Sequence, residues 1–343
     1  MRVLVDVTHP AHVHLFRPTI AALEARGHEV AIASRDKDVT VDLLDAYGFD
    51  HTVLSRKRPG VLGVAREWLA REARLLRFAR SFDPDVLLSR LNPATAHVAT
   101  LLDAPNLVFH DTEIAGMLGR VTTPFTTMVC TPAAYAGEFG TQHQRYNGFH
   151  ELAYLHPARF DPDPRRLEDA GVDPEASYSV VRLVGMDAHH DAGATGFSPE
   201  TVRSLIDRLA PHGPVYVSSE HALPTGLAEH RNPVPSVDLH HLLAFADTYV
   251  GDSSTMATEA AVLGTPSVRY NPFDEEMGVF EDLADRGLVR SAHDEQTSVD
   301  TAVRLAADPD TGHRWRRRRR RLLAEKVDVT AYMVELVEEV GGR

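Results

Sequence analysis

Short runs of apolar, often β-branched residues alternate with longer segments of helical hydrophobic spacing in the first half of the chain. The runs that predict strands are residues 3–7, 29–33, 51–53, 85–88, 106–109 and 128–130. The segments that predict helices are residues 18–26, 37–47 and 61–82. Because this alternation is typical of parallel strands joined by crossover helices, we expect a doubly wound α/β sheet in this half.

The connector Asp161-Pro162-Asp163-Pro164 interrupts the pattern, since proline disfavours helix in the residue before it. After it the alternation restarts, with predicted strands at 178–184, 215–218, 248–250 and 267–270 and predicted helices at 199–210, 239–245 and 256–263. We predict two Rossmann-like domains, 1–160 and 161–325, and a C-terminal helix at 326–343 that can pack back on the first domain. Such sheets bind ligands at the carboxyl ends of their strands, so the two domains are expected to face a shared cleft.

Composition favours a folded cytoplasmic protein. The net charge is −13, and only three of the 36 basic residues are lysines, which is compatible with adaptation to high salt. An acidic chain also argues against general nucleic-acid binding. Cys130 is the only cysteine, so neither an internal disulfide nor a four-thiolate metal site can form. No leader and no apolar run of spanning length is evident, so we expect a cytoplasmic location, with peripheral contact at the inner face of a membrane as the alternative.

The segment 251–266 combines a strand end with a helix start. Residues 248–252 complete a predicted strand, and the small hydroxyl residues Ser253, Ser254 and Thr255 can cap the helix that follows. Free amides at a helix start form an anion site suited to a diphosphate. Glu259 follows near the N-terminus of the helix, where we expect an accessible carboxylate able to accept both ribose hydroxyls. An ordinary strand, cap and helix with a solvated Glu259 is the alternative.

The run Asp252-Ser253-Ser254-Thr255-Met256-Ala257-Thr258-Glu259-Ala260, with Leu263-Gly264-Thr265-Pro266, resembles the donor motif of UDP-GlcNAc 2-epimerases. It is also similar to the matching segment of the lipid-linked GlcNAc transferase of peptidoglycan synthesis. These resemblances imply a GT-B fold in which Ser253, Ser254 and Thr255 hold the donor phosphates and Glu259 holds the ribose. The chain departs from the epimerases at Ser254 and Thr255, where they have two glycines.

The segment after the first strand, residues 8–18, contains three histidines and is expected to be a loop at the first domain's strand ends. Its equivalent in the peptidoglycan transferase ends in His-Val-Phe-Pro, and an ungapped count places His12 at that family's histidine. His12 is therefore a candidate catalytic base or a ligand of the donor phosphates. Capping or packing is the alternative, mainly for His9 and His14. We assign no metal, because the three histidines lack ligand spacing and a neighbouring carboxylate.

Other polar groups follow predicted strands. His110-Asp111-Thr112-Glu113 resembles an acidic catalytic segment of the 2-epimerases, which makes Asp111 and Glu113 candidate catalytic residues; a helix cap is the alternative. In the second domain the candidate donor-binding residues at equivalent strand ends are Arg182, His190, Ser219 and Glu220. A structural salt bridge is the alternative for Arg182 and His190. The Asp-Pro-Asp patterns are expected to be turns, and they give no metal site.

A basic run from Arg316 to Arg321 contrasts with the acidic remainder of the chain. A solvated helix paired with nearby acids is one interpretation, and peripheral contact with anionic lipid headgroups is the other.

Over its whole length the chain resembles an archaeal and bacterial family of glycosyltransferase-like proteins of undefined function. The residues that carry this resemblance include His9-Pro10, His12, residues 27–30, residues 151–155 and residues 187–191, together with the donor motif. It implies a GT-B fold and brings no known substrate with it. Taken with the donor motif, our main expectation is a glycosyltransferase that uses a nucleotide-sugar co-substrate, UDP-sugar being expected, without a further cofactor. The acceptor would be a surface glycan or a lipid-linked molecule, bound by the first domain. The alternatives are a nucleotide-sugar 2-epimerase and a non-catalytic GT-B binding subunit.

Overall fold

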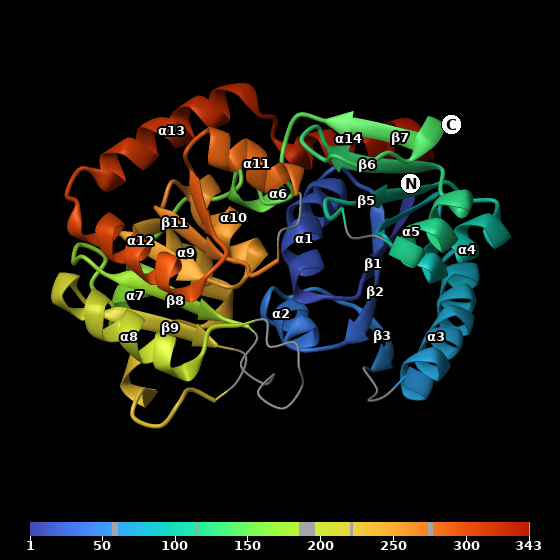
Figure 1. Cartoon of the computed structure of the whole chain (residues 1–343). Coiled ribbons are helices and arrows are strands. Elements are labelled where there is room, and N and C mark those ends of the chain that lie inside the picture. The colour runs from blue at the N-terminus through green and yellow to red at the C-terminus, as the bar shows by residue number, and fades with distance from the viewer. Residues whose placement is uncertain (57–60, 114–115, 185–195, 220–221, 274–276, 343) are drawn as a thin grey trace. The chain divides into compact units, whose positions relative to one another are not determined.

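The structure is a computed structural model, and it describes residues 1–56, 61–113, 116–184, 196–219, 222–273 and 277–342 (Figure 1). The chain divides into two compact units, one formed by Met1–Arg159 with Lys326–Arg343 and the other by Phe160–Glu325. Each unit is built around its own parallel sheet. The doubly wound α/β architecture expected from the sequence is therefore confirmed.

The first unit contains a seven-stranded sheet of order β3-β2-β1-β4-β5-β6-β7, in which all neighbouring strands are parallel. The strands are β1 (Arg2–Val7), β2 (Glu29–Asp36), β3 (Thr52–Arg56), β4 (Val86–Arg90), β5 (Asn106–Phe109), β6 (Met128–Pro132) and β7 (His143–Tyr146). The helices are α1 (Pro10–Ala25), α2 (Thr40–Ala46), α3 (Val61–Phe82), α4 (Pro93–Leu102), α5 (Gly116–Thr122), α6 (Leu152–Leu155) and α14 (Val329–Gly341). Leu4, Leu75 and Leu87 lie in a core shared by the sheet, α3 and α4.

The strand order of this sheet reverses between β1 and β4. The chain runs outward from β1 to β3 and then returns to place β4 on the other side of β1. Loops that leave neighbouring strands in opposite directions create a crevice at their carboxyl ends, which is where open α/β sheets bind ligands. The residues that follow β1, β4 and β5 are thus the first unit's candidate ligand contacts.

Helix α1 begins earlier than the sequence pattern predicted. We expected residues 8–18 to form a loop with a helix starting at 18, and this was wrong: the helix starts at Pro10, and His9 is its N-cap. The His9 side chain accepts a hydrogen bond from the Ala11 amide at 3.2 Å. Proline suits the first helical turn because its missing N–H has no partner to lose there, whereas Pro18 inside the helix gives up one backbone bond.

Helix α14 packs against α1 and α6 in the first unit. Its Glu338 pairs with Arg26 at 2.6 Å and with His28 at 3.0 Å, and the Thr330 hydroxyl donates to the Ala153 carbonyl at 2.7 Å. The last helix of the chain is therefore part of the first unit, and it covers the helical layer that carries α1.

The second unit contains a five-stranded parallel sheet of order β12-β11-β10-β8-β9. The strands are β8 (Ser179–Leu183), β9 (Val215–Ser219), β10 (Thr248–Gly251), β11 (Ser267–Tyr270) and β12 (Val289–Ala292). The helices are α7 (Arg165–Glu168), α8 (Pro199–Leu209), α9 (Leu239–Phe245), α10 (Ser254–Leu263), α11 (Gly278–Asp285), α12 (Glu295–Ala307) and α13 (Thr311–Glu325). Val181, Leu205 and Val299 lie in the core shared by the sheet, α8 and α12.

Candidate functional site

An ion-paired cluster occupies the carboxyl ends of β4 and β5 in the first unit. Arg90, the last residue of β4, donates to Asp111 Oδ1 through NH2. His150, which precedes α6, lies with Nδ1 at 2.7 Å from the other carboxylate oxygen of Asp111. Burial alone would raise the pKa of Asp111, but Arg90 and His150 hold it well below its usual value. Asp111 is therefore a carboxylate at physiological pH, and both of its oxygens are engaged.

His12 lies beside this cluster, on the first turn of α1. Its ring nitrogen Nδ1 is 3.3 Å from the backbone nitrogen of Thr8. The residue is half-buried, and desolvation of the imidazole, followed by the charge of Arg90, holds the pKa of His12 well below its usual value. The imidazole is thus neutral at physiological pH, and the charge of Asp111 is among those that act on it.

The other two histidines of α1 have structural contacts. His9 caps the helix, and burial, followed by the charge of Lys37, lowers its pKa to about 4. The His14 ring packs against Tyr154 with centroids 5.6 Å apart and against Tyr47 at 6.1 Å. Among the described residues no group of three or more histidine, cysteine or acidic side chains is arranged to hold a metal ion.

Glu113 and His110 lie on either side of Asp111 in the sequence but have different surroundings. Glu113 Oε1 accepts a hydrogen bond from the Ala136 amide at 3.1 Å. The His110 ring packs edge-on against Tyr135 and Phe139, both at 5.7 Å, and burial lowers its pKa to about 4. Glu113 is half-buried, so its carboxylate remains a candidate proton acceptor.

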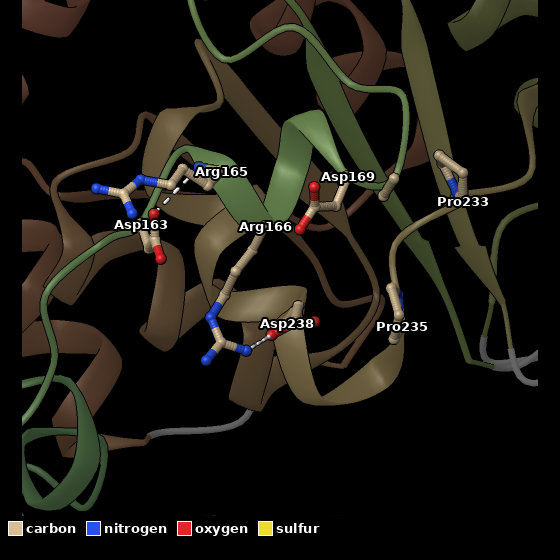
Figure 2. Close-up of a pocket in the computed structure, with 8 residues that line it drawn as sticks. Asp163, Arg165, Arg166, Asp169, Pro233, Pro235 and Asp238 are labelled. Carbon is tan, nitrogen blue, oxygen red and sulfur yellow. Dashed lines mark hydrogen bonds and ion pairs between the residues drawn. The ribbon is translucent and has the colours of Figure 1, made fainter.

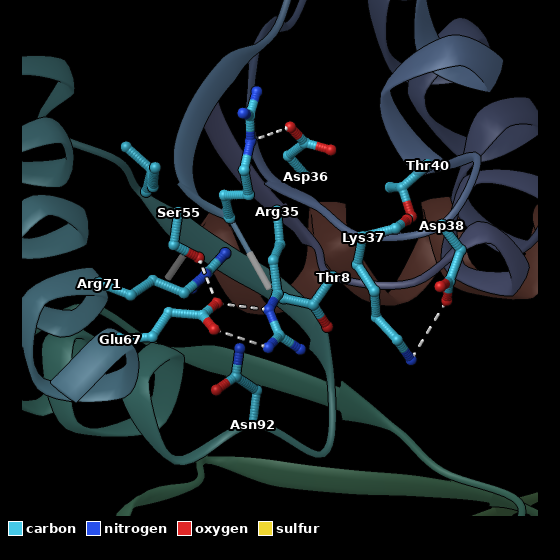
Figure 3. A network of polar contacts seen from close by, with 12 residues as sticks. Thr8, Arg35, Asp36, Lys37, Asp38, Thr40, Ser55, Glu67, Arg71 and Asn92 are labelled. Atoms are coloured by element: carbon cyan, nitrogen blue, oxygen red, sulfur yellow. Dashed lines mark hydrogen bonds and ion pairs between the residues drawn. The ribbon is translucent and has the colours of Figure 1, made fainter. Parts of the chain in front are cut away.

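Buried polar networks fix the strands that carry this site (Figure 3). Arg35, near the end of β2, forms two hydrogen bonds to Glu67 of α3, at 2.6 and 3.0 Å, and Ser55 of β3 donates to the same carboxylate at 3.0 Å. Asp6 of β1 accepts bonds from Arg71 of α3 and from Asn92 after β4. Since removing one partner from a buried ion pair leaves an uncompensated charge, these contacts are structural supports for the strand ends.

In the second unit, β10 ends beside the start of α10. Ser253 is the N-cap, and its hydroxyl accepts from the Met256 amide at 3.3 Å. Asp252 Oδ1 accepts from the Val184 amide at 2.8 Å, which ties the loop to the end of β8. A Cβ on Gly251 would lie 2.6 Å from the Tyr249 hydroxyl and 2.7 Å from the Arg182 carbonyl, so only glycine fits there.

Arginines lie at the carboxyl edge of this second sheet. Arg182, on β8, donates through NH1 to the Ser218 hydroxyl at 2.9 Å, and Ser219 beside it ends β9. Arg269, on β11, donates through Nε to the Ser254 hydroxyl at 3.1 Å, and its guanidinium lies over the Phe280 ring at 4.0 Å.

The structure thus brings Ser253 and Ser254 together with Arg269, which sequence analysis did not single out. An arginine inside the otherwise uncharged strand 267–270 was the available signal. The half-buried Ser253 and Ser254 and the exposed Thr255 leave the first turn of α10 accessible. Two further candidates, His190 and Glu220, lie outside the described residues.

Glu259 is less accessible than we expected. Its side chain is 4% exposed, and Oε1 lies 2.9 Å from Nε2 of His240 on α9. The expectation of an open carboxylate near the helix start was wrong because α10 is buried on all sides after its first turn, with neighbours that include β11, α9 and α13. The assignment of Glu259 to the ribose stays a prediction, and His240 is the residue that would orient it.

A separate pocket lies away from these strand ends (Figure 2). It has a volume of about 560 Å³ and is lined by α7, the prolines Pro233 and Pro235, and Asp238. Arg166 pairs with Asp238 across it. Its lining carries both charge signs and none of the candidate donor-binding residues, so we do not assign the donor to it.

Two parallel doubly wound units in one chain are the arrangement of the GT-B fold, and solved structures with that fold superimpose on this chain. Spinosyn forosaminyltransferase SpnP superimposes with a TM-score of 0.68 at 18% identity, covering 100% of both chains. Spinosyn rhamnosyltransferase SpnG, solved with thymidine diphosphate, gives a TM-score of 0.66 at 18% identity, covering 98% of this chain and 100% of its own. At such identity the likeness shows the fold alone.

The chain belongs to the family described as "Protein of unknown function (DUF354)", whose model matches residues 1–341. A relative, the uncharacterized protein MJ0665 of Methanocaldococcus jannaschii, is 24% identical over 303 residues, which cover 85% of this chain and 88% of the relative. The expected membership of a family of undefined function is therefore confirmed, and the solved structures confirm the expected GT-B fold. Among the described residues, no helix is long and apolar enough to cross a membrane.

Proposed function

We propose that this protein is a glycosyltransferase that moves a sugar from a nucleotide-sugar donor to a surface-glycan or lipid-linked acceptor. The observation that carries the proposal is the start of α10, where Ser253 caps the helix and Ser254 accepts a hydrogen bond from Arg269. The first amides of a helix have no partners within it, and together with the helix dipole they attract phosphate groups. A GT-B protein of known structure, SpnG, was solved with thymidine diphosphate.

In this proposal the second unit binds the donor. The diphosphate is held by Ser253, Ser254 and Thr255, with Arg182 and Arg269 as the nearby cations. These groups stabilise the negative charge that develops on the leaving diphosphate, so the reaction needs no divalent metal. Glu259, oriented by His240, accepts the ribose hydroxyls once the nucleotide is bound. UDP-sugar is the expected donor from the resemblance to UDP-GlcNAc enzymes.

The first unit binds the acceptor at the carboxyl ends of β1, β4 and β5. Asp111 and Glu113 supply carboxylates there, and the half-buried His12 supplies an imidazole. Neutral imidazoles and carboxylates suit an acceptor hydroxyl, which must be oriented and lose its proton during transfer.

The test uses purified protein with a panel of UDP-, GDP- and dTDP-sugars, with and without a membrane extract as acceptor source. We expect calorimetry to detect binding of one nucleotide class, release of its nucleoside diphosphate when acceptor is present, and no loss of release in EDTA. If no donor binds and no nucleotide is released, the proposal fails. Donor binding without turnover, even with crude acceptors, would favour a non-catalytic binding subunit.

A 2-epimerase remains the second candidate, because residues 252–266 resemble the epimerase donor motif as closely as the transferase motif. Epimerisation exchanges the proton at C2 of the sugar with solvent. Incubation of the bound donor in deuterated water without acceptor therefore separates the two reactions. Deuterium at C2 supports epimerisation, and its absence from a bound donor supports transfer.

For a lipid-linked acceptor we propose peripheral membrane contact through α13. Its arginines divide into two sets: Arg318 and Arg319 turn inward and donate to the Gly287 and Val262 carbonyls at 3.0 and 2.8 Å. The outward set is Arg316, Arg317, Arg320 and Arg321.

Helical spacing places this outward set of arginines on one face of α13, and each arginine near an anionic surface contributes roughly 1 kcal/mol to membrane binding. Cosedimentation with anionic but not neutral vesicles, lost when the outward set is changed to serine, is the expected result; equal sedimentation with both vesicles contradicts it.

A further inference from the structure

The hydrogen-bond partner of His12 Nδ1 determines where its ring proton lies. The Thr8 backbone N–H donates to Nδ1 at 3.3 Å, and the Thr8 hydroxyl is 3.4 Å from the same nitrogen. A backbone N–H can only donate, so Nδ1 must accept, and in a neutral ring the proton is then on Nε2. Among the described residues, Nε2 of His12 has no hydrogen-bond partner, and His12 as a whole is half-buried. Its free edge therefore presents an N–H group.

His150 has the opposite arrangement. Its Nδ1 faces Asp111 Oδ2 at 2.7 Å, and an ionised carboxylate can only accept, so the proton of His150 is on Nδ1. Arg90 NH1 also approaches this nitrogen, but if Nδ1 were the acceptor its lone pair would lie 2.7 Å from a carboxylate oxygen, and two acceptors at that distance repel. The remaining nitrogen, Nε2, is buried without a partner among the described residues, and the His150 side chain is 4% exposed. His150 is thus a positioning residue that substrate does not reach.

The surroundings of His12 also oppose protonation of its ring. The ring is on the third residue of α1, where the positive end of the helix dipole disfavours an imidazolium. Burial adds a desolvation cost, and Arg90 adds a positive charge nearby, so the pKa of His12 lies well below its usual value. A neutral imidazole that donates through Nε2 is the state these contacts stabilise.

We infer that His12 acts as a neutral hydrogen-bond donor, directing Nε2–H at a substrate oxygen that bears or gains negative charge, and that it does not accept the acceptor's proton. This inference rests on the proposed transferase function. In the transfer the acceptor oxygen bonds to the anomeric carbon, and the bond from that carbon to the diphosphate oxygen breaks with its electron pair leaving on the diphosphate. The hydroxyl proton passes to a carboxylate, either Asp111 or Glu113, and His12 keeps its own proton throughout.

Side-chain isosteres test this role, because a glutamine amide can place an N–H near the position of Nε2 and an asparagine amide near that of Nδ1. We expect His12→Gln to keep kcat/KM within about tenfold of wild type with an unchanged pH profile, while His12→Ala and His12→Asn lose on the order of 10²–10³-fold. If His12 were the base, His12→Gln would be as inactive as His12→Ala and the acid limb of the pH profile would disappear. Thermal unfolding of each variant checks that the fold is retained.

The ring itself gives a readout that does not depend on activity. Nitrogen-15 spectra of histidine-labelled wild type, compared with His12→Gln to assign the signal, report which nitrogen is protonated. At neutral pH we expect protonated Nε2 and unprotonated Nδ1; the reverse tautomer or an imidazolium would overturn the inference. If wild type turns over no donor, the transferase proposal has failed while the spectrum still decides the tautomer. If wild type is active and His12→Gln matches His12→Ala, the inference alone has failed.

Discussion

The carboxyl edges of the two sheets differ in the kind of charge they present. The edge of the first sheet is rich in histidines of lowered pKa, and its Arg90 is neutralised by Asp111. The edge of the second sheet combines a helix start and hydroxyl groups with the guanidinium groups of Arg182 and Arg269. A permanently charged diphosphate matches the second edge, and a neutral hydroxyl matches the first. In the proposed function the diphosphate is therefore placed at the second edge and the acceptor hydroxyl at the first.

Among the variants, Asp111→Asn is expected to give the largest difference between its effect on the transfer rate and its effect on nucleoside diphosphate affinity. An amide cannot accept from both Arg90 and His150, and it is a much weaker proton acceptor than a carboxylate. We expect the transfer rate to fall on the order of 10²–10⁴-fold, with nucleoside diphosphate affinity unchanged. Steady-state kinetics and calorimetry on the same preparation measure the two effects.

The exposed Asp42 of α2 provides a matched control, because Asp42→Asn removes the same charge from the same unit. It should leave both quantities within about twofold, as surface substitutions usually do. A loss of diphosphate affinity in Asp111→Asn, with the fold intact by urea unfolding, would mean that the first edge also holds the donor phosphates.

Arg269→Gln is expected to have the next largest effect, and on the opposite edge. Glutamine keeps a donor for Ser254 but removes the charge, and a hydrogen bond to a charged group is worth roughly 1.5–3 kcal/mol. Nucleoside diphosphate affinity should fall about 10- to 100-fold by calorimetry. Arg290→Gln, on the exposed face of the neighbouring β12, is the control. Equal affinities for all three proteins would remove Arg269 from the donor site.

Unfolding measured against pH tests the neutrality of the first edge. Burial lowers the pKa of His9 and His110 from 6.5 to about 4, so below pH 6.5 the unfolded chain binds protons that the folded chain does not. The unfolding free energy should therefore fall as the pH drops from 6.5 toward 4, by roughly 1.4 kcal/mol per pH unit for each such histidine. Urea titrations at pH 7, 6 and 5 measure the slope.

The variant His110→Phe removes one buried histidine that stays neutral in the folded protein. The unfolding free energy should therefore depend less steeply on pH, by up to the contribution of one proton, about 1.4 kcal/mol per pH unit. Phenylalanine also keeps the ring contacts with Tyr135 and Phe139. A free energy that is flat between pH 7 and 5 in wild type would show that these imidazoles titrate normally and that the first edge is cationic in mildly acidic solution.

The alternation of strands and helices made the two sheets predictable, and the small hydroxyl residues after β10 predicted the capped start of α10. Two strands were missed, β7 with sequence HQRY and β12 with sequence VRSA, because both are short edge strands with polar, exposed positions. The start of α1 was misplaced because two prolines, Pro10 and Pro18, both resemble a helix start, and only the folded chain shows Pro18 inside the helix.

The missed site residues share one physical reason. His150, in the segment between β7 and α6, reaches Asp111 after β5 although β6 lies between these two strands in the sheet. Arg269 of β11 reaches Ser254, which follows the neighbouring strand β10. Local sequence patterns report the periodicity of an element, not the order of strands, so such partners cannot be read from spacing. Glu259 shows the converse: its place near a helix start was predicted, but its burial depends on how the whole helix is covered.

Calorimetric titration of nucleoside diphosphates into the purified protein tests the central claim most directly, with wild type, Arg269→Gln and Asp111→Asn measured side by side. The account predicts that one diphosphate, UDP in the first instance, binds wild type and Asp111→Asn with similar affinity and binds Arg269→Gln more weakly. If neither UDP, GDP nor dTDP binds the folded wild-type protein, the start of α10 is not a donor site and the glycosyltransferase assignment is contradicted.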